Sequence, residues 1–84
     1  MVTESTRAIS PARASSLDQV VRLRADADLM DGCARRLLAT ASALSGCAAA
    51  PESSRPALER QAAACTTAAE QLRAAAEALL AHVR

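Results

Sequence analysis

The feature that most constrains this chain is an apolar stripe whose members recur at alternating steps of three and four residues in each half of the sequence. Such steps keep successive side chains on one helix face, which is typical of helices that pack along a shared seam. Large residues recur every seven positions, at the position called d, and alanines mostly fill the a positions between them. We expect the helix–helix interface to consist of Val20, Leu23, Ala27, Met30, Ala34, Leu37, Ala41, Leu44, Leu58, Ala62, Cys65, Ala69, Leu72, Ala76, Leu79 and Val83.

Local start and stop signals divide the chain around these two stripes. Ser16 and Gln19 have the spacing of a capping box, Gly46 follows the first stripe, and Pro56 precedes the second. The predicted layout is a flexible N-terminal tail at 1–15 and a hairpin at 16–84, made of a helix at 16–45, a connection at 46–55 and a helix at 56–83. Because a short connection makes neighbouring helices antiparallel, we predict an all-α fold, an antiparallel two-helix hairpin with a heptad seam.

The size and composition of the chain favour assembly with other helices. It has 84 residues, of which 51% are hydrophobic and none is aromatic. A chain this short has a marginal core, and alanine methyls bury little area, so dimerisation into a four-helix bundle is the expected remedy. In an antiparallel pair we expect a layers to meet d layers, so that each alanine faces a larger residue. The apolar residues outside the seam form the expected partner face: Leu17, Val21, Leu29, Leu38 and Leu80.

The charges exclude several classes of partner. The net charge is +1, and acids and bases are interspersed as helical pairs such as Asp18/Arg22, Arg24/Asp28 and Asp31/Arg35. No basic face or aromatic stacking platform is present for nucleic acid, and no polybasic patch is present for a membrane. We therefore expect the partner to be another helical protein or a second copy of this chain. The use of arginine without lysine or asparagine is typical of GC-rich bacterial genomes.

Reactive side chains do not form a catalytic constellation in the sequence. His82 stands one turn from the end of the second stripe, where a helix dipole favours a cationic group. Cys33, Cys47 and Cys65 are odd in number and widely spaced, so neither a disulfide framework nor a zinc site is predicted. We expect no enzyme, no catalytic residue, no cofactor and no metal.

The segment Leu44-Ser45-Gly46 stands between two helices of matching character. Over residues 16–84 the chain resembles the WXG family of type VII secretion, small helical hairpins with Trp-x-Gly at the turn. Leu44 replaces the tryptophan, and the family's tyrosine-containing secretion signal is absent. The resemblance implies a homodimer or heterodimer that forms a four-helix bundle, as a secretion substrate or an accessory partner. The implied location is cytoplasmic, or secreted without a Sec signal peptide.

A second interpretation of the same segment stays open. Leu44-Ser45-Gly46-Cys47 matches a bacterial lipobox, in which the cysteine is lipidated and becomes the new N-terminus. Arg35-Arg36 would then be the charged region of a signal peptide, and residues 37–44 a short apolar region. On this interpretation the protein is a short membrane-anchored lipoprotein, attached through Cys47.

Overall fold

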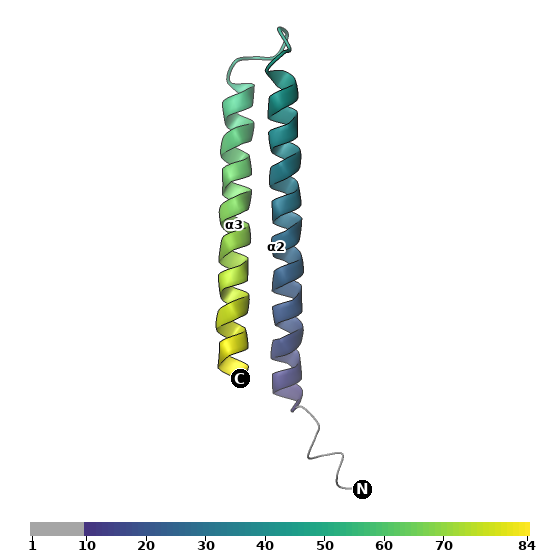
Figure 1. Ribbon diagram of the computed structural model, residues 1–84, viewed down its shortest axis with the longest axis vertical. Coiled ribbons are helices and arrows are strands. Elements are labelled where there is room, and N and C mark those ends of the chain that lie inside the picture. Colours follow the sequence, from purple (N-terminus) through teal and green to yellow (C-terminus); the bar gives the residue numbers. More distant parts are fainter. Residues whose placement is uncertain (1–9) are drawn as a thin grey trace, which may run out of the picture.

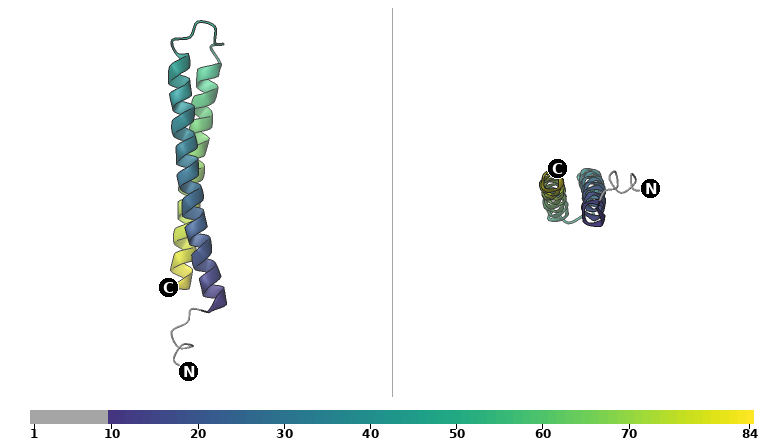
Figure 2. Two further views of the ribbon diagram at one scale, coloured as in Figure 1. Left: turned by 90° about the vertical axis from the view of Figure 1, so that its right-hand side faces the viewer. Right: turned by 90° about the horizontal axis from the view of Figure 1, so that it is seen from below.

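Two long helices form the whole of the described fold. The computed structural model describes residues 10–84 and contains α2 (Pro11–Leu44) and α3 (Ser54–Val83), which run antiparallel and pack against each other (Figure 1). The predicted all-helical hairpin is therefore confirmed. Seen from the side and from the end, the two helices make a single layer with no second layer above or below it (Figure 2).

The first helix begins five residues earlier than predicted. Ser10 is its N-cap, and the Ser10 hydroxyl accepts a hydrogen bond of 3.1 Å from the backbone N–H of Arg13. Pro11 occupies the first turn, where a missing N–H costs nothing. The predicted capping box at Ser16 lies inside the helix instead. The predicted tail at 1–15 is thus wrong from Pro11 onward, and its first nine residues lie outside the described part of the chain.

The connection spans 45–53 and is shorter than the predicted 46–55. α2 ends at Leu44 with Ser45 as its C-cap, and α3 begins two residues before the predicted position, after Ser53. No described residue has a positive φ, so Gly46 does not end the helix in the left-handed conformation that glycine usually supplies there. Instead, the N–H of Cys47 donates to the carbonyl of Leu44 at 3.0 Å, which continues the chain into successive tight turns.

The seam buries its small residues and leaves its large ones partly exposed. Every a position except the last is buried: Val20, Ala27, Ala34, Ala41, Ala62, Ala69 and Ala76. The remaining predicted interface residues are only half-buried: Leu23, Met30, Leu37, Leu44, Leu58, Cys65, Leu72, Leu79 and Val83. Within residues 10–84, no large side chain is fully buried. The centre of the interface is therefore made of alanine.

Cross-helix hydrogen bonds show which alanines meet. Arg24 on α2 reaches Glu77 on α3 at 2.7 Å. Seven residues further along α2, Asp31 accepts from Arg73, also at 2.7 Å. These two pairs set the height of one helix against the other.

By this register, alanine faces alanine. Ala27 lies between the two α2 members of these pairs, and Ala76 lies between the two α3 members; both are 0% exposed. By the heptad repeat, the next two layers toward the connection pair Ala34 with Ala69 and Ala41 with Ala62. The expected contact of alanine with a larger residue is therefore not met. Two methyl groups in one layer let the helix axes approach closely, and this approach displaces the d residues to the side.

A substitution at this centre tests the close approach. We expect Ala69→Leu to destabilise the hairpin by about 1–3 kcal/mol, although it adds apolar volume, because the layer has no space for three more carbons. Urea unfolding followed by circular dichroism measures the change. The matched control is Ala63→Leu, at an exposed position of the same helix. A stabilising effect of Ala69→Leu would show that the helices are not held at the distance that paired alanines permit.

Candidate functional site

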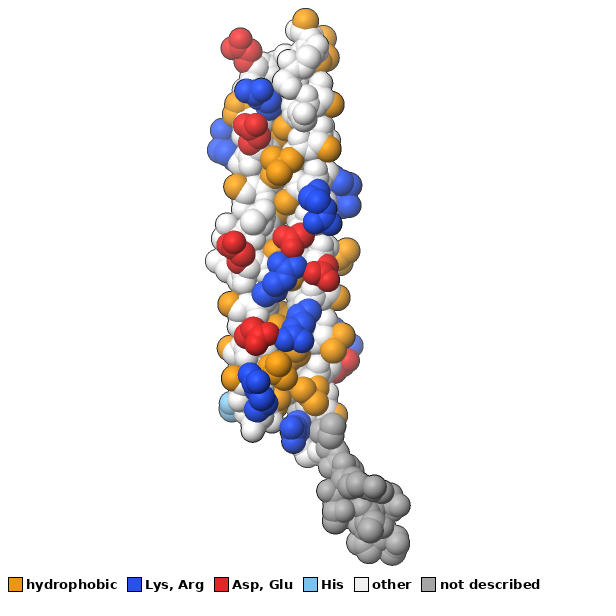
Figure 3. Space-filling model, viewed as in Figure 1, with side chains coloured by type: hydrophobic (Ala, Val, Ile, Leu, Met, Phe, Trp, Pro, Cys, Tyr) orange, Lys and Arg blue, Asp and Glu red, His pale blue; other side chains and the backbone are white. Residues whose placement is uncertain are grey.

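A cluster of five charged side chains joins the helices near the middle of one face. A single guanidinium nitrogen of Arg73 donates to Asp28 Oδ1 at 2.8 Å and to Asp31 Oδ2 at 2.7 Å. Beside it, Arg24 and Glu77 form the pair described above. We call these five residues the ion cluster. Figure 3 shows acidic and basic side chains alternating across both helices on this face.

The carboxylates hold Arg73 in its charged form. Hydrogen bonds to Asp31 and then to Asp28 raise the pKa of Arg73 above its ordinary value, against a smaller opposing effect of desolvation. A raised pKa in the folded state gives stability that is complete below the ordinary pKa and is lost only when the pH rises through the raised one. Arginine is already charged at any ordinary pH, so salt concentration and not alkaline pH is the variable that weakens this contact.

The charged pairs predicted from the sequence all lie within single helices. Asp18 and Arg22 do form the expected pair, at 3.4 Å. Asp28 and Asp31 pair with Arg73 on the other helix instead. Spacing along one helix cannot reveal such contacts, because they depend on how far one helix is shifted against the other.

The ion cluster supplies the register that the alanine layers lack. Successive alanine layers are nearly identical, so a shift of one heptad would preserve most of them. The same shift would set Asp31 opposite Thr66 or Leu80 in place of Arg73. Polar residues at single positions are a known means of specifying register in coiled coils. The cluster is therefore a structural device of the hairpin.

The opposite face carries the half-buried large residues. In a helix with about 100° per residue, the position four residues after a and the position four residues before it lie on opposite sides of a. Arg24 and Asp31 are four residues after Val20 and Ala27, whereas the d residues are four residues before an a residue. The ion cluster and the d residues thus flank the alanine seam on opposite sides. We call the d side the leucine face: Leu23, Met30, Leu37, Leu44, Leu58, Cys65, Leu72 and Leu79.

A shallow groove between the helices opens on the leucine face. It is lined by Cys33, Arg36, Leu37, Thr40, Gln61 and Cys65. An Arg36 nitrogen lies 3.4 Å from the sulfur of Cys33 and closes one side of the groove. The two members that belong to the seam, Leu37 and Cys65, come from different helices. The groove is therefore a depression in the leucine face itself.

The predicted partner face is not one surface. Val21 and Leu29 are each 65% exposed and Leu38 is 50% exposed, while Leu17 and Leu80 are half-buried. Leu29 and Leu38 are nine residues apart, which places them on opposite sides of α2, about 180° apart. Leu29 borders the leucine face, whereas Leu17, Val21, Leu38 and Leu80 lie on the same side of the seam as the ion cluster. The half-buried row of the leucine face is the larger apolar surface, and sequence reasoning had assigned all of it to the interior.

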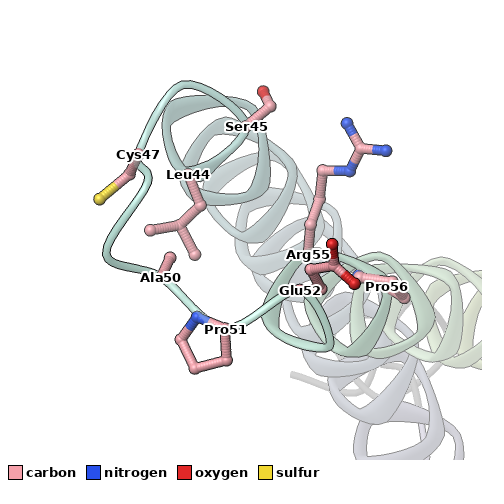
Figure 4. A pocket seen from close by; sticks show the side chains of 8 residues that line it. All are labelled: Leu44, Ser45, Cys47, Ala50, Pro51, Glu52, Arg55 and Pro56. Atoms are coloured by element: carbon pink, nitrogen blue, oxygen red, sulfur yellow. The ribbon is translucent and has the colours of Figure 1, made fainter.

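Leu44, at the turn, packs beneath the connection. Figure 4 shows its side chain directed toward Ala50 and Pro51, while the thiol of Cys47 points away from them. These residues line a dent at the end of the hairpin, together with Glu52 and Arg55. Cys47 is exposed, and Cys33, Cys47 and Cys65 are all free thiols.

The remaining predictions about chemistry concern isolated groups. His82 is exposed in the last turn of α3, beside the first turns of α2. In the described part of the chain, no group of three or more His, Cys, Asp or Glu side chains could hold a metal ion. Neither described helix has an apolar stretch long enough to span a bilayer.

Comparison of the chain with protein-family models, with curated proteins and with solved structures gives no match. The geometry of the two faces therefore carries the functional argument.

Substitution of the bridging arginine tests the ion cluster. We expect Arg73→Ala to lower the melting temperature more than Arg22→Ala, since Arg22 pairs only within its own helix. The difference should shrink in about 1 M salt, where the Debye length falls to about 3 Å. It should stay constant between about pH 7 and pH 10, because Arg73 keeps its charge. Equal effects of the two substitutions at low salt would remove the register role of the cluster.

Proposed function

We propose that this chain is a non-catalytic helical protein–protein interaction module. The observation that carries the proposal is that no large apolar side chain of the described residues is fully buried. The eight d residues of the seam stay partly exposed along the entire hairpin, although d is a position where a helical pair normally keeps its core. A surface of this kind is stabilised when other helices cover it.

The single-layer architecture supports the same conclusion. Stable helical domains bury their apolar faces between at least two layers, and this hairpin has one. Its buried centre consists of six alanines and one valine, whose side chains bury little area. Covering the partly exposed leucines contributes roughly 25 cal/mol for each Å² removed from water. A second helical layer therefore adds hydrophobic stabilisation that the single hairpin lacks.

The hairpin layout is compatible with a role as a type VII secretion substrate or as the accessory partner of one. The turn begins at Leu44, where the WXG family that the chain resembles carries its tryptophan, and Leu44 packs beneath the connection as a large apolar residue would there. A folded hairpin of this kind is cytoplasmic, or is exported without a Sec signal peptide. We include these assignments in the proposal.

The alternative function is a short lipoprotein attached through Cys47. The exposure of Cys47 and the preceding Leu44-Ser45-Gly46 favour it. Cleavage before Cys47 would, however, remove the whole of α2. The alanines of α3 that α2 covers, Ala62, Ala69 and Ala76, would then lie exposed, so the hairpin geometry favours the interaction module.

Measurement of molar mass tests the interaction module. We expect light scattering and sedimentation at micromolar concentration to give an oligomer, or else a monomer that unfolds without cooperativity until a partner is added. Burial of the partly exposed leucines in the assembly is the reason. A monomer that unfolds in one cooperative transition and shows high stability would contradict the proposal.

Intact mass of C-terminally tagged protein from its native host separates the two functions. We expect the full-length, unmodified mass in the soluble fraction, because residues 11–44 form half of the hairpin. A mass that starts at a lipidated Cys47, recovered from the membrane fraction, would establish the lipoprotein. The variant Cys47→Ala serves as the control, since it abolishes membrane attachment only in the second case.

A further inference from the structure

We propose that the shallow groove of the leucine face binds a medium-chain fatty acid, with the acyl chain against Leu37 and Cys65 and the carboxylate on the guanidinium of Arg36. The groove belongs to a single hairpin, so this inference goes beyond the proposed function and does not depend on it. It adds a small-molecule ligand to a chain whose proposed partner is a protein.

The groove exists because small side chains replace large ones at this height of the hairpin. Every other d position of α3 holds leucine, whereas this one holds Cys65. On the α2 side, Cys33 and Thr40 line the groove, and both are smaller than leucine. A missing leucine in a row of leucines leaves a depression that the hairpin does not fill by itself.

The size of the groove suits a short acyl chain. Its volume is about 390 Å³, and small-molecule sites typically have about 300–1,000 Å³. Along α2 the groove extends from Cys33 to Thr40, which is about 10 Å at 1.5 Å per residue. An extended chain of about eight carbons has a similar length, since its C–C bonds of about 1.5 Å zigzag.

The strong cation of the groove lies at one end. Arg36 is the only Arg, Lys, Asp or Glu among the six residues that line it. One nitrogen of its guanidinium lies 3.4 Å from the sulfur of Cys33, and another lies 3.7 Å from the position that a Cβ on Gly32 would occupy. The groove extends from this head group toward Thr40. A ligand that fits therefore has an anionic head and an apolar tail.

The charge of Arg36 has no carboxylate partner among residues 10–84. Five ion pairs join residues of this range, and none includes Arg36 or its neighbour Arg35. The contact of Arg36 with Cys33 does not replace one, because sulfur is a weak acceptor. A nitrogen of Arg35 lies 3.8 Å from the same Cβ position on Gly32, so two guanidiniums converge there. A carboxylate matches a planar guanidinium with two parallel hydrogen bonds.

Between its ends the groove is apolar. Leu37 and Cys65 contribute to it from different helices, and a free cysteine behaves as a small hydrophobic residue. The hydroxyl of Thr40 donates to the backbone carbonyl of Arg36 at 3.0 Å, so its proton is already used. Removal of this apolar surface from water stabilises a bound acyl chain.

Octanoate is the probe for this site. We expect a dissociation constant on the order of 1 mM, because an open groove covers only one side of the ligand. Amide chemical shifts of the groove residues measure the occupancy. At the same concentration, 1-octanol lacks the carboxylate and octylamine carries the opposite charge, so each should occupy about a tenth of the sites or less. Equal occupancy by 1-octanol would overturn the role of Arg36.

Two substitutions test the two ends of the ligand. Arg36→Ala removes the cation, and Cys65→Leu fills the groove with the side chain that the other d positions of α3 carry. We expect the first to raise the dissociation constant for octanoate by about tenfold and the second to abolish binding. Alanine and leucine are both good helix formers, so circular dichroism should show that both variants stay helical.

The matched controls make the same changes away from the groove. Arg22→Ala removes a charge at the same heptad position, where Arg22 pairs with Asp18 at 3.4 Å. Thr67→Leu adds a leucine at an exposed position of α3 that does not line the groove. We expect both variants to bind octanoate within about twofold of the wild type. Unchanged binding by Cys65→Leu would show that octanoate binds elsewhere and would overturn the site.

The three thiols supply an independent measurement on the unmodified chain. Cys33 and Cys65 line the groove, while Cys47 is exposed in the connection. We expect saturating octanoate to slow maleimide labelling of Cys33 and Cys65 by about tenfold and to leave the rate at Cys47 unchanged. Equal effects on all three thiols, or none, would overturn the site.

The outcomes also separate this inference from the proposed function. An oligomer that neither binds octanoate nor protects its thiols with it retains the interaction module and overturns the fatty-acid site. A stable, cooperatively folded monomer that binds octanoate in the groove supports the site and contradicts the module.

Discussion

The contact of alanine with alanine across the seam is the constraint from which the rest of the structure follows. Ala27, Ala69 and Ala76 are completely buried because the facing layer is equally small. Two helices this close have no space between them for a leucine. The larger d residues therefore lie beside the contact, where the pair alone covers them only in part. The marginal core and the available surface of this hairpin have the same origin.

The close seam also requires a separate source of specificity. Dispersion between methyl groups is favourable in any layer and does not distinguish one layer from the next. The distinction comes from Arg73, which binds Asp28 and Asp31 through one nitrogen, and from the neighbouring pair of Arg24 with Glu77. Exposed ion pairs contribute little to stability. Here they select one arrangement among several with similar packing, while the apolar residues supply the free energy.

The heptad stripe was sufficient to predict two antiparallel helices, because a period of seven sustained over four repeats fits packed helices and few structures besides. It was insufficient to predict which layers meet, because alanine at a and leucine at d are compatible with either a–d or a–a contact between the helices. Only the cross-helix pairs of Arg24 and Arg73 decide between them.

The start of the first helix was not predicted for another reason. Ser10 and Pro11 form a sufficient N-terminal signal on their own, yet no apolar residue larger than alanine follows within the next turn, so the segment has the composition of a tail. The assignment of Leu29 and Leu38 to one face was an error of helical geometry that the spacing of nine residues could have excluded.

The position of the connection fixes the order in which the seam can form during folding. Leu44 and Leu58 are separated by a short loop, whereas Ser16 and Val83 are separated by most of the chain, and the entropy lost on closing a loop grows with its length. We therefore expect the first layer to form beside the connection and the helices to join progressively toward the open end. The ion cluster lies about half-way along this path. A chain that starts in a register shifted by one heptad has formed only a few alanine layers when it reaches the ion cluster. Thr66 or Leu80 then lies where Arg73 lies in the native register. Little packing free energy is lost when the helices separate and pair again.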